Sequence, residues 1–283
     1  EYTPPPGFLP LASHNLESSS TLNPKKYFEP AIYSNGGGSA VTVDTLQFKP
    51  DFIWVKSRNA TANHGLYDSV RGNNVRLVTD GTGAESSVTG PIPTDSGFTI
   101  AGTSYYNPSG SAGAATFATW CWKAGGSSNN FNIDDIGYTT ASDAGITNGD
   151  INLTKLSVNT KAGFSIGLFA GTGSSGTVAT GLSNTKVVIL KNRTTASTKW
   201  VFYHNVLDGS YDFMYLNNSD SNSNSTLTHT LADTFKVASN NDTNASGSNY
   251  VFYAWEEIPG YSRIGTYQGN GNSNGPYIDC GFR

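Results

Sequence analysis

The chain has 283 residues and a formal net charge of −4, with 13% charged and 12% aromatic residues. Its 17 lysines and arginines are outnumbered by 21 aspartates and glutamates, which disfavours charge-driven binding to nucleic acid. No apolar stretch reaches the roughly 18 residues that a membrane span needs. The 32 glycines and the low charge are typical of strands and turns with a neutral polar surface.

Short apolar runs, each bounded by Gly, Asn, Asp, Ser or Pro, recur along the chain, whereas helical periodicity is almost absent. The clearest runs are residues 52–55, 97–100, 186–191, 200–203 and 250–255. Short runs between turn residues are typical of antiparallel sandwiches and barrels. The sequence therefore predicts an all-β protein.

These runs form an internal repeat. Lys56 and Arg58 follow the first run as Lys191 and Arg193 follow its later counterpart, and five blocks match in the same order at an offset of about 135 residues. The repeat predicts two tandem antiparallel β-sandwich units, at residues 27–126 and 162–263.

Three segments lie outside these units. Residues 1–26 are rich in proline and are expected to form an N-terminal arm that packs on a neighbour, or else a frayed terminus. Residues 127–161 have loop composition and are predicted to be a linker. Residues 264–283 are interpreted as the start of a third unit, in a longer natural chain, or as a closing strand. We expect one or both termini to dock by strand pairing, which predicts a homo-oligomer.

Catalytic and metal-binding patterns are weak. Glu256 and Glu257 are adjacent, so on a strand they point to opposite faces and do not form a carboxylate pair. The aspartates at 134, 135 and 143 are candidate calcium ligands, but solvated turn caps are the favoured interpretation. The four histidines are scattered, which gives no support to a zinc site. We therefore expect no catalytic residues, no metal and no cofactor.

Two residue pairs are candidates for a covalent or ionic link. Cys121 and Cys280 are a possible disulfide in a secreted protein, but we expect free thiols and no bridge, because two cysteines do not make a disulfide framework. Asp68 and Arg71 are spaced to fix a turn or close a sheet edge, and a functional role for this pair is the alternative.

The aromatic residues are the main candidates for a binding surface. Trp120 and Trp122 alternate with Cys121 and so share one face of a strand, as either a sugar-stacking platform or part of a core. The core is favoured, because the repeat keeps large residues at Tyr253 and Trp255. Recognition is expected in the loops Asn217–Thr226 and Asn240–Asn249, whose neutral donors and acceptors suit glycans or polar protein surfaces. Individual carbohydrate-binding residues are not assigned.

Several strings carry a family resemblance. They are residues 48–59, 66–72, 95–100, 120–125 and 253–271. They resemble a module of virion and tail-associated proteins of marine bacteriophages, over about residues 27–283. The resemblance implies a tandem concanavalin- or SPRY-like β-sandwich, and no catalytic residue carries over from it.

The resemblance and the composition together predict a non-enzymatic structural and adhesive protein of a phage virion, tail fibre or similar extracellular assembly. It would contact host-surface glycan, copies of itself or other virion proteins, with no nucleic acid and no membrane insertion. The alternative is a free lectin-like carbohydrate-binding module of a secreted protein. The fold alone does not separate the two, because sandwiches serve both roles.

Overall fold

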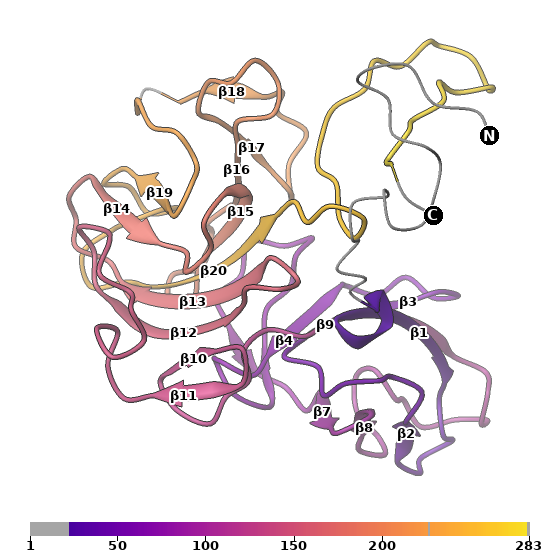
Figure 1. Ribbon diagram of the computed structural model, residues 1–283. Coiled ribbons are helices and arrows are strands. Elements are labelled where there is room, and N and C mark those ends of the chain that lie inside the picture. The colour runs from indigo at the N-terminus through magenta and orange to yellow at the C-terminus, as the bar shows by residue number, and fades with distance from the viewer. Residues whose placement is uncertain (1–22, 226, 282–283) are drawn as a thin grey trace, which may run out of the picture.

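The computed structural model describes residues 23–225 and 227–281. In these residues the chain is all-β, with one short 3₁₀ turn, η1 (Pro24–Lys26), and no α-helix, as the sequence predicts. Most of the expected N-terminal arm, residues 1–22, lies outside the described residues. Two groups of sheets lie side by side (Figure 1), and we call residues 28–122 the N-terminal half and residues 131–256 the C-terminal half.

The N-terminal half is a small β-sandwich. Its larger sheet has the order β1-β9-β3-β4 and its smaller sheet the order β2-β8-β7. Residues such as Tyr33, Ile53, Phe98 and Phe117 fill the space between the two sheets as one buried cluster. The strands are β1 (Phe28–Ser34), β2 (Val41–Val43), β3 (Phe52–Ser57), β4 (Gly65–Asp68), β7 (Pro91–Thr94), β8 (Gly97–Ile100) and β9 (Thr116–Trp122), with β5 (Val75–Arg76) and β6 (Ser86–Ser87) as a separate pair.

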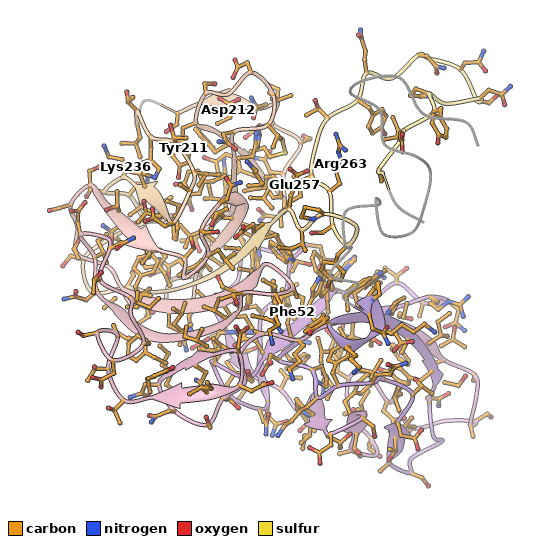
Figure 2. The ribbon with its side chains drawn as sticks, in the orientation of Figure 1. Phe52, Tyr211, Asp212, Lys236, Glu257 and Arg263 are labelled. Carbon is orange, nitrogen blue, oxygen red and sulfur yellow. The ribbon has the colours of Figure 1, made fainter. Side chains whose placement is uncertain are left out.

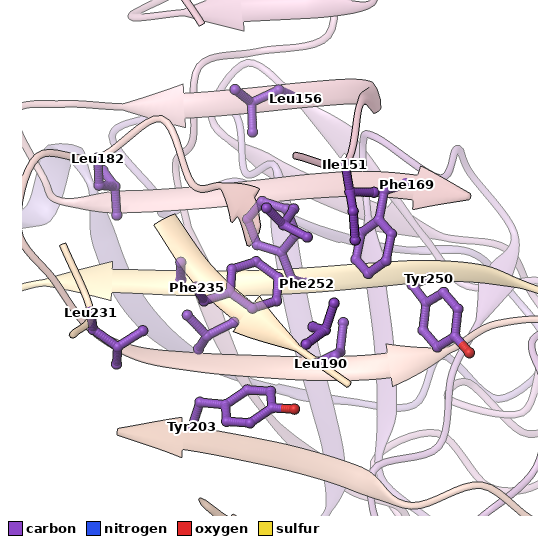
Figure 3. Close-up of a cluster of buried hydrophobic side chains, with 14 of the residues drawn as sticks. Ile151, Leu156, Phe169, Leu182, Leu190, Tyr203, Leu231, Phe235, Tyr250 and Phe252 are labelled. Carbon is purple, nitrogen blue, oxygen red and sulfur yellow. The ribbon is translucent and has the colours of Figure 1, made fainter. Parts of the chain in front are cut away.

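The C-terminal half has a nine-stranded sheet covered by a two-stranded one. Their orders are β11-β10-β12-β13-β20-β15-β16-β17-β18 and β14-β19. Leu190, Phe235, Tyr250 and Phe252 belong to the core between them, and Tyr203 lies at the edge of this cluster (Figure 3). The strands are β10 (Phe131–Ile133), β11 (Ile136–Tyr138), β12 (Leu153–Asn159), β13 (Phe164–Ala170), β14 (Gly176–Ala179), β15 (Thr185–Asn192), β16 (Trp200–His204), β17 (Asp212–Tyr215), β18 (Ser223–Asn224), β19 (Thr234–Val237) and β20 (Asn249–Glu256).

The segment predicted as a linker, residues 127–161, is part of the large sheet. It contains β10, β11 and β12, and β10 pairs with β12 in parallel while β12 pairs with β13. Phe131, Leu156 and Val158 join the core of the C-terminal half. The polar composition of the segment hides these strands, because Asn132, Ser157 and Asn159 on their other face are buried but paired by hydrogen bonds.

The strand pairings of the two halves have the same register. Lys56 lies opposite Ala118 in β3 and β9, and Lys191 lies opposite Val251 in β15 and β20. Trp122 pairs with Phe28 as Trp255 pairs with Phe164. The smaller sheets agree as well, with Val41 opposite Ile100 and Gly176 opposite Val237. Each pair is displaced from its counterpart by the offset of the sequence repeat.

The larger sheets of the two halves pack face to face. Phe52 belongs to a buried cluster that also contains Phe164, Val251 and Tyr253, and it lies where the halves meet (Figure 2). Its ring centroid is 4.9 Å from that of Tyr253, and the rings of Trp122 and Trp255 are 6.2 Å apart. The strands at this contact are buried on both faces, which explains why their sequences are apolar runs without strict alternation.

A buried ion pair lies at this contact. Asp68 Oδ1 accepts hydrogen bonds from the backbone N–H groups of Val70 and Arg71, and Arg71 Nε donates to Asp68 Oδ2 at 2.5 Å. Tyr253 Oη in the other half also donates to Asp68 Oδ2, at 2.7 Å. The pair therefore fixes the turn after β4, as the spacing predicts, and also joins the two halves.

Further polar contacts join the halves. Glu85 accepts two hydrogen bonds from Arg193, both at 2.8 Å, and lies 3.6 Å from Arg71. The buried Lys191 ammonium donates to Thr198 O at 2.6 Å and to Thr82 O of the N-terminal half at 3.2 Å. Burial lowers the pKa of Lys191 to about 8.

The C-terminal segment differs from the rest of the chain. Residues 264–281 contain no strand, and Tyr267 and Tyr277 are exposed. The segment leaves the C-terminal half after β20, close to Glu257 and Arg263 (Figure 2). Tyr261, just before it, packs edge-on against Tyr27 with ring centroids 6.4 Å apart.

We expect Tyr253→Phe to lower the free energy of unfolding by about 1–3 kcal/mol, because it removes a donor from the buried Asp68 carboxylate. Urea unfolding of the variant and the wild type measures this loss. Tyr267→Phe, at an exposed tyrosine, is the matched control. Equal stability of the two variants would contradict a stabilising role for the contact between the halves.

We expect the wild type to gain about 2–3 kcal/mol of stability relative to Lys191→Met between pH 7 and pH 10. The folded-state pKa of Lys191, about 8, lies below the ordinary value of 10.5, so the unfolded chain holds more protons in this range. The cost of the buried charge is complete below pH 8 and disappears as the amine loses its proton. Urea unfolding at several pH values tests this, with Lys161→Met as the control, and a flat difference would contradict it.

Candidate functional site

An open pocket lies over strands β16 and β17 of the C-terminal half, with a volume of about 330 Å³. We call it the β16–β17 pocket. In the antiparallel pair, Val201 lies opposite Tyr215 and Tyr203 opposite Phe213, so these four side chains share one face of the sheet. Val201 and Tyr203 belong to the core, and Phe213 and Tyr215 are only partly buried. The floor of the pocket is thus an aromatic extension of the core.

The rim is a short loop, residues 238–243, that follows β19. Asn240 Oδ1 accepts hydrogen bonds from the backbone N–H groups of Asp242 and Thr243, at 3.0 and 3.1 Å. Thr243 Oγ1 donates to Ala238 O at 2.6 Å, and Asp242 Oδ1 accepts from the backbone N–H of Lys199 at 2.7 Å. The loop is therefore held in one conformation by its own side chains.

Several polar groups of the rim have no hydrogen-bond partner among the described residues. They are Asp242 Oδ2, the Asn240 amide nitrogen and the Asn241 side-chain amide, since the bonds of these residues use other atoms. Asp242 is the one charged residue in the lining. Burial raises the pKa of Tyr203 above its ordinary value, so its hydroxyl stays neutral. The pocket combines an aromatic floor with a nearly neutral, polar rim.

Lys199 lies beside the pocket and orients the floor. Its ammonium lies over the Tyr215 ring, 4.1 Å from the centroid, and 3.4 Å from Asp220 Oδ2. The Phe213 and Tyr215 rings meet edge to face at 5.5 Å. These contacts hold Tyr215 in place, and the Lys199 ammonium covers one face of its ring.

Both loops predicted to take part in recognition contribute to the lining of the pocket. The second loop supplies residues 240–243 of the rim, and the first supplies Ser225. In the first loop, Asn217 accepts from Trp200 N and donates to Gly81 O, which makes it a structural contact between the halves. Residue 226 of that loop lies outside the described residues.

The tryptophans are largely structural. Trp200 is fully buried, and Trp54, Trp122 and Trp255 pack against the cluster between the halves. Trp122 therefore lies against a core, as favoured, whereas Trp120, the other residue of the predicted pair, is partly exposed and belongs to none of the buried clusters. Cys121 points to the opposite side of β9 from Trp122, into the core of the N-terminal half.

Both cysteines are free, as expected. Burial raises the pKa of the Cys121 thiol to about 12, and Cys280 is exposed. A thiol with so high a pKa is a weak nucleophile at neutral pH.

The acidic residues singled out in the sequence serve local contacts. Asp134 accepts from the Thr160 backbone N–H and hydroxyl, at 2.9 and 2.6 Å, and Asp135 pairs with Lys123 at 2.6 Å. The Asp143 carboxylate accepts from the Thr139 hydroxyl, and the backbone N–H of Asp143 donates to Thr140 Oγ1. Within the described part of the chain, no three His, Cys, Asp or Glu side chains are grouped so that they could hold a metal ion.

The adjacent glutamates also have separate partners. Glu256 accepts from the backbone and hydroxyl of Ser183, whereas Glu257 accepts from the backbone N–H of Ile264. They therefore do not face a common cleft.

Sequence reasoning missed the floor of the pocket. Phe213 and Tyr215 are spaced two apart in a short strand, which was the available signal, but the run has only four residues. Asp51 was also missed. Its buried carboxylate accepts hydrogen bonds from Ser69 Oγ and from the backbone N–H groups of Ala124 and Gly126. Burial raises its pKa, and its role is to fix the chain where it leaves β9.

Comparisons with known proteins complete the description. Residues 23–283 match a family model described as a domain of unknown function, DUF7483. Searches of curated proteins and of solved structures gave no significant match. Among the described residues, no helix has the length and apolar character needed to cross a membrane.

Proposed function

The chain belongs to the DUF7483 family, and we propose that it is a non-enzymatic structural and adhesive protein of a phage virion, tail fibre or similar extracellular assembly. It contacts host-surface glycan or neighbouring subunits. The observation that carries the adhesive role is the β16–β17 pocket, whose aromatic floor and nearly neutral rim suit a polar, uncharged ligand.

We further propose that the two halves are tandem units of one concanavalin- or SPRY-like sandwich. The matching registers of the larger sheets support this, with Lys56 and Lys191 at equivalent positions. The smaller sheets add β2 with β8 and β14 with β19 in matching register. Tandem modules of this kind suit extended assemblies, because each unit can carry its own contact surface.

The proposed partners are copies of the chain or other virion proteins. The described edge strand β1 contains Pro30, which lacks a backbone N–H, so lateral pairing at this edge is disfavoured. The segment of residues 264–281, with exposed Tyr267 and Tyr277, is a better candidate for contact with a neighbour. The low content of charged residues leaves little repulsion between copies.

The second candidate is a free lectin-like carbohydrate-binding module of a secreted protein. The pocket favours it equally, because a sugar can bind there without any assembly. The two candidates differ in oligomeric state and in association with a particle.

We expect the purified chain to bind bacterial cell-envelope polysaccharide immobilised on a surface. Binding is measured by interferometry at physiological salt, with an unrelated β-sandwich protein as the control. Because the chain carries few charges, raising the salt to 0.5 M should leave the signal nearly unchanged. Absence of binding to every envelope polysaccharide tested would contradict the adhesive role.

We expect the intact chain to form a homo-oligomer at micromolar concentration. Light scattering on the intact chain, on a chain lacking residues 1–26 and on one lacking residues 264–283 identifies the segment responsible. A smaller mass for either deletion supports docking through that terminus. A monomer in all three samples would overturn the assembly proposal and favour the free module.

A further inference from the structure

The position of the β16–β17 pocket is filled in the N-terminal half by a tyrosine. Tyr67 lies opposite Ile53 as Tyr203 lies opposite Val188, so Tyr67 and Tyr203 are equivalent under the proposed repeat. Tyr106 follows the last residue of β8 by six positions, as Thr243 follows the last residue of β19. The two halves thus place different residues at the same site.

Tyr106 closes the site in the N-terminal half. Its side chain is fully buried, and its ring centroid is 6.0 Å from that of Tyr67. A Cβ at Gly65, the counterpart of Val201, would collide with the Tyr106 ring, so this glycine makes room for the tyrosine. Tyr33 Oη donates to Tyr106 O at 2.8 Å and anchors this segment.

Thr243 leaves the site open in the C-terminal half. Its hydroxyl turns back to Ala238 O, and the cavity of about 330 Å³ lies over Tyr203 and Tyr215. The loop beside it is fixed by Asn240 and Asp242 rather than collapsed into the opening. The opening is therefore built into the C-terminal half and is not a packing defect shared by both halves.

The lining indicates the class of ligand. An aromatic floor contacts the apolar C–H face of a sugar ring, and Asp242 Oδ2 and the Asn240 amide can bond hydroxyl groups at its edge. The lining contains no Lys, Arg or His, Asp242 repels anions, and the Lys199 ammonium beside the floor is already paired with Asp220, so an acidic sugar or a phosphate is disfavoured. The volume is at the low end of ligand pockets, which are about 300–1,000 Å³.

We infer that the β16–β17 pocket binds one neutral hexose ring, packed on the aromatic floor that includes Phe213 and Tyr215 and hydrogen-bonded by Asp242 and Asn240. This inference rests on the proposed adhesive function and specifies its ligand. Such a small ligand is expected to bind with a Kd in the millimolar range.

The test is a titration of the full chain with glucose, galactose, mannose and N-acetylglucosamine, followed by ¹H–¹⁵N NMR. At least one of these sugars should shift amide signals of residues 240–243 in a saturable way. Thr243→Tyr, which transfers the closing tyrosine from the N-terminal half, should weaken binding at least tenfold. Tyr215→Ala and Asp242→Asn should each weaken it about tenfold, and Tyr277→Ala, at an exposed tyrosine, is the control.

Each outcome of the titration either supports or overturns the hexose assignment. Tyr215→Ala keeps the test decisive if Thr243→Tyr does not fold, as judged by the dispersion of its NMR spectrum. Binding unchanged in the folded pocket variants, or no binding of any sugar up to 50 mM, would overturn the hexose assignment. Self-association that Thr243→Tyr abolishes, without any sugar binding, would also overturn it and point to a peptide side chain of a second copy.

The results that would contradict the proposed function differ from those that would contradict the hexose assignment. Wild-type chain that binds hexose through the pocket but neither envelope polysaccharide nor its own copies supports the pocket assignment and contradicts the adhesive role. Polysaccharide binding that survives Thr243→Tyr supports the adhesive role and contradicts the pocket assignment.

Discussion

The face-to-face packing of the two larger sheets is the constraint on which the rest of the structure depends. Each strand at this contact has one side in the core of its own half and the other side against the other half. In β20, for example, Phe252 faces the core of the C-terminal half and Tyr253 faces the N-terminal half. Since the contact consists mainly of large aromatic side chains, its burial supplies a major part of the driving force for folding.

The polar groups inside this contact give it a fixed geometry. Asp68 and Arg71 are fully buried as side chains, and a buried ion pair by itself contributes little net stability. The pair instead contributes to geometry, because the hydrogen bond from Tyr253 Oη to Asp68 depends on how the two halves are placed. Glu85 with Arg193 and Thr82 with Lys191 add two further directed contacts across the same boundary. Together these bonds select one relative placement from those that apolar packing alone allows.

Because the contact fixes the two larger sheets, the two halves can differ in the loops that lie away from it. The loops after β8 and β19 lie on the sides of the sheets that face away from the contact, and they hold Tyr106 in one half and Thr243 in the other. Closing the site in the N-terminal half adds a buried aromatic residue to a small core. Opening it in the C-terminal half exposes part of an aromatic floor, and the larger core of that half offsets the lost burial. The proposed division of labour is therefore structural for one half and ligand-binding for the other.

Much of the fold was predictable from local pattern. Apolar runs between turn residues predicted the all-β class, and Lys56 and Lys191, matched in the sequence repeat, lie in strands whose pairings have matching register. The Asp68–Arg71 spacing predicted a fixed turn. The linker prediction for residues 127–161 was wrong in part, because β10 and β11 have only three residues each, and one face of β10 and β12 carries buried polar side chains in place of apolar ones.

The sequence by itself determined the strands and the turn chemistry, because these depend on neighbours in the chain. Only the tertiary structure decided that Tyr253 meets Asp68, 185 positions away, and that Phe213 and Tyr215 form a floor beneath Asp242. It also placed Tyr106 against Tyr67 in the N-terminal half and left a cavity over Tyr203 in the C-terminal half. These are contacts between distant segments, and their geometry is set by how the sheets stack, which no local pattern of residues encodes.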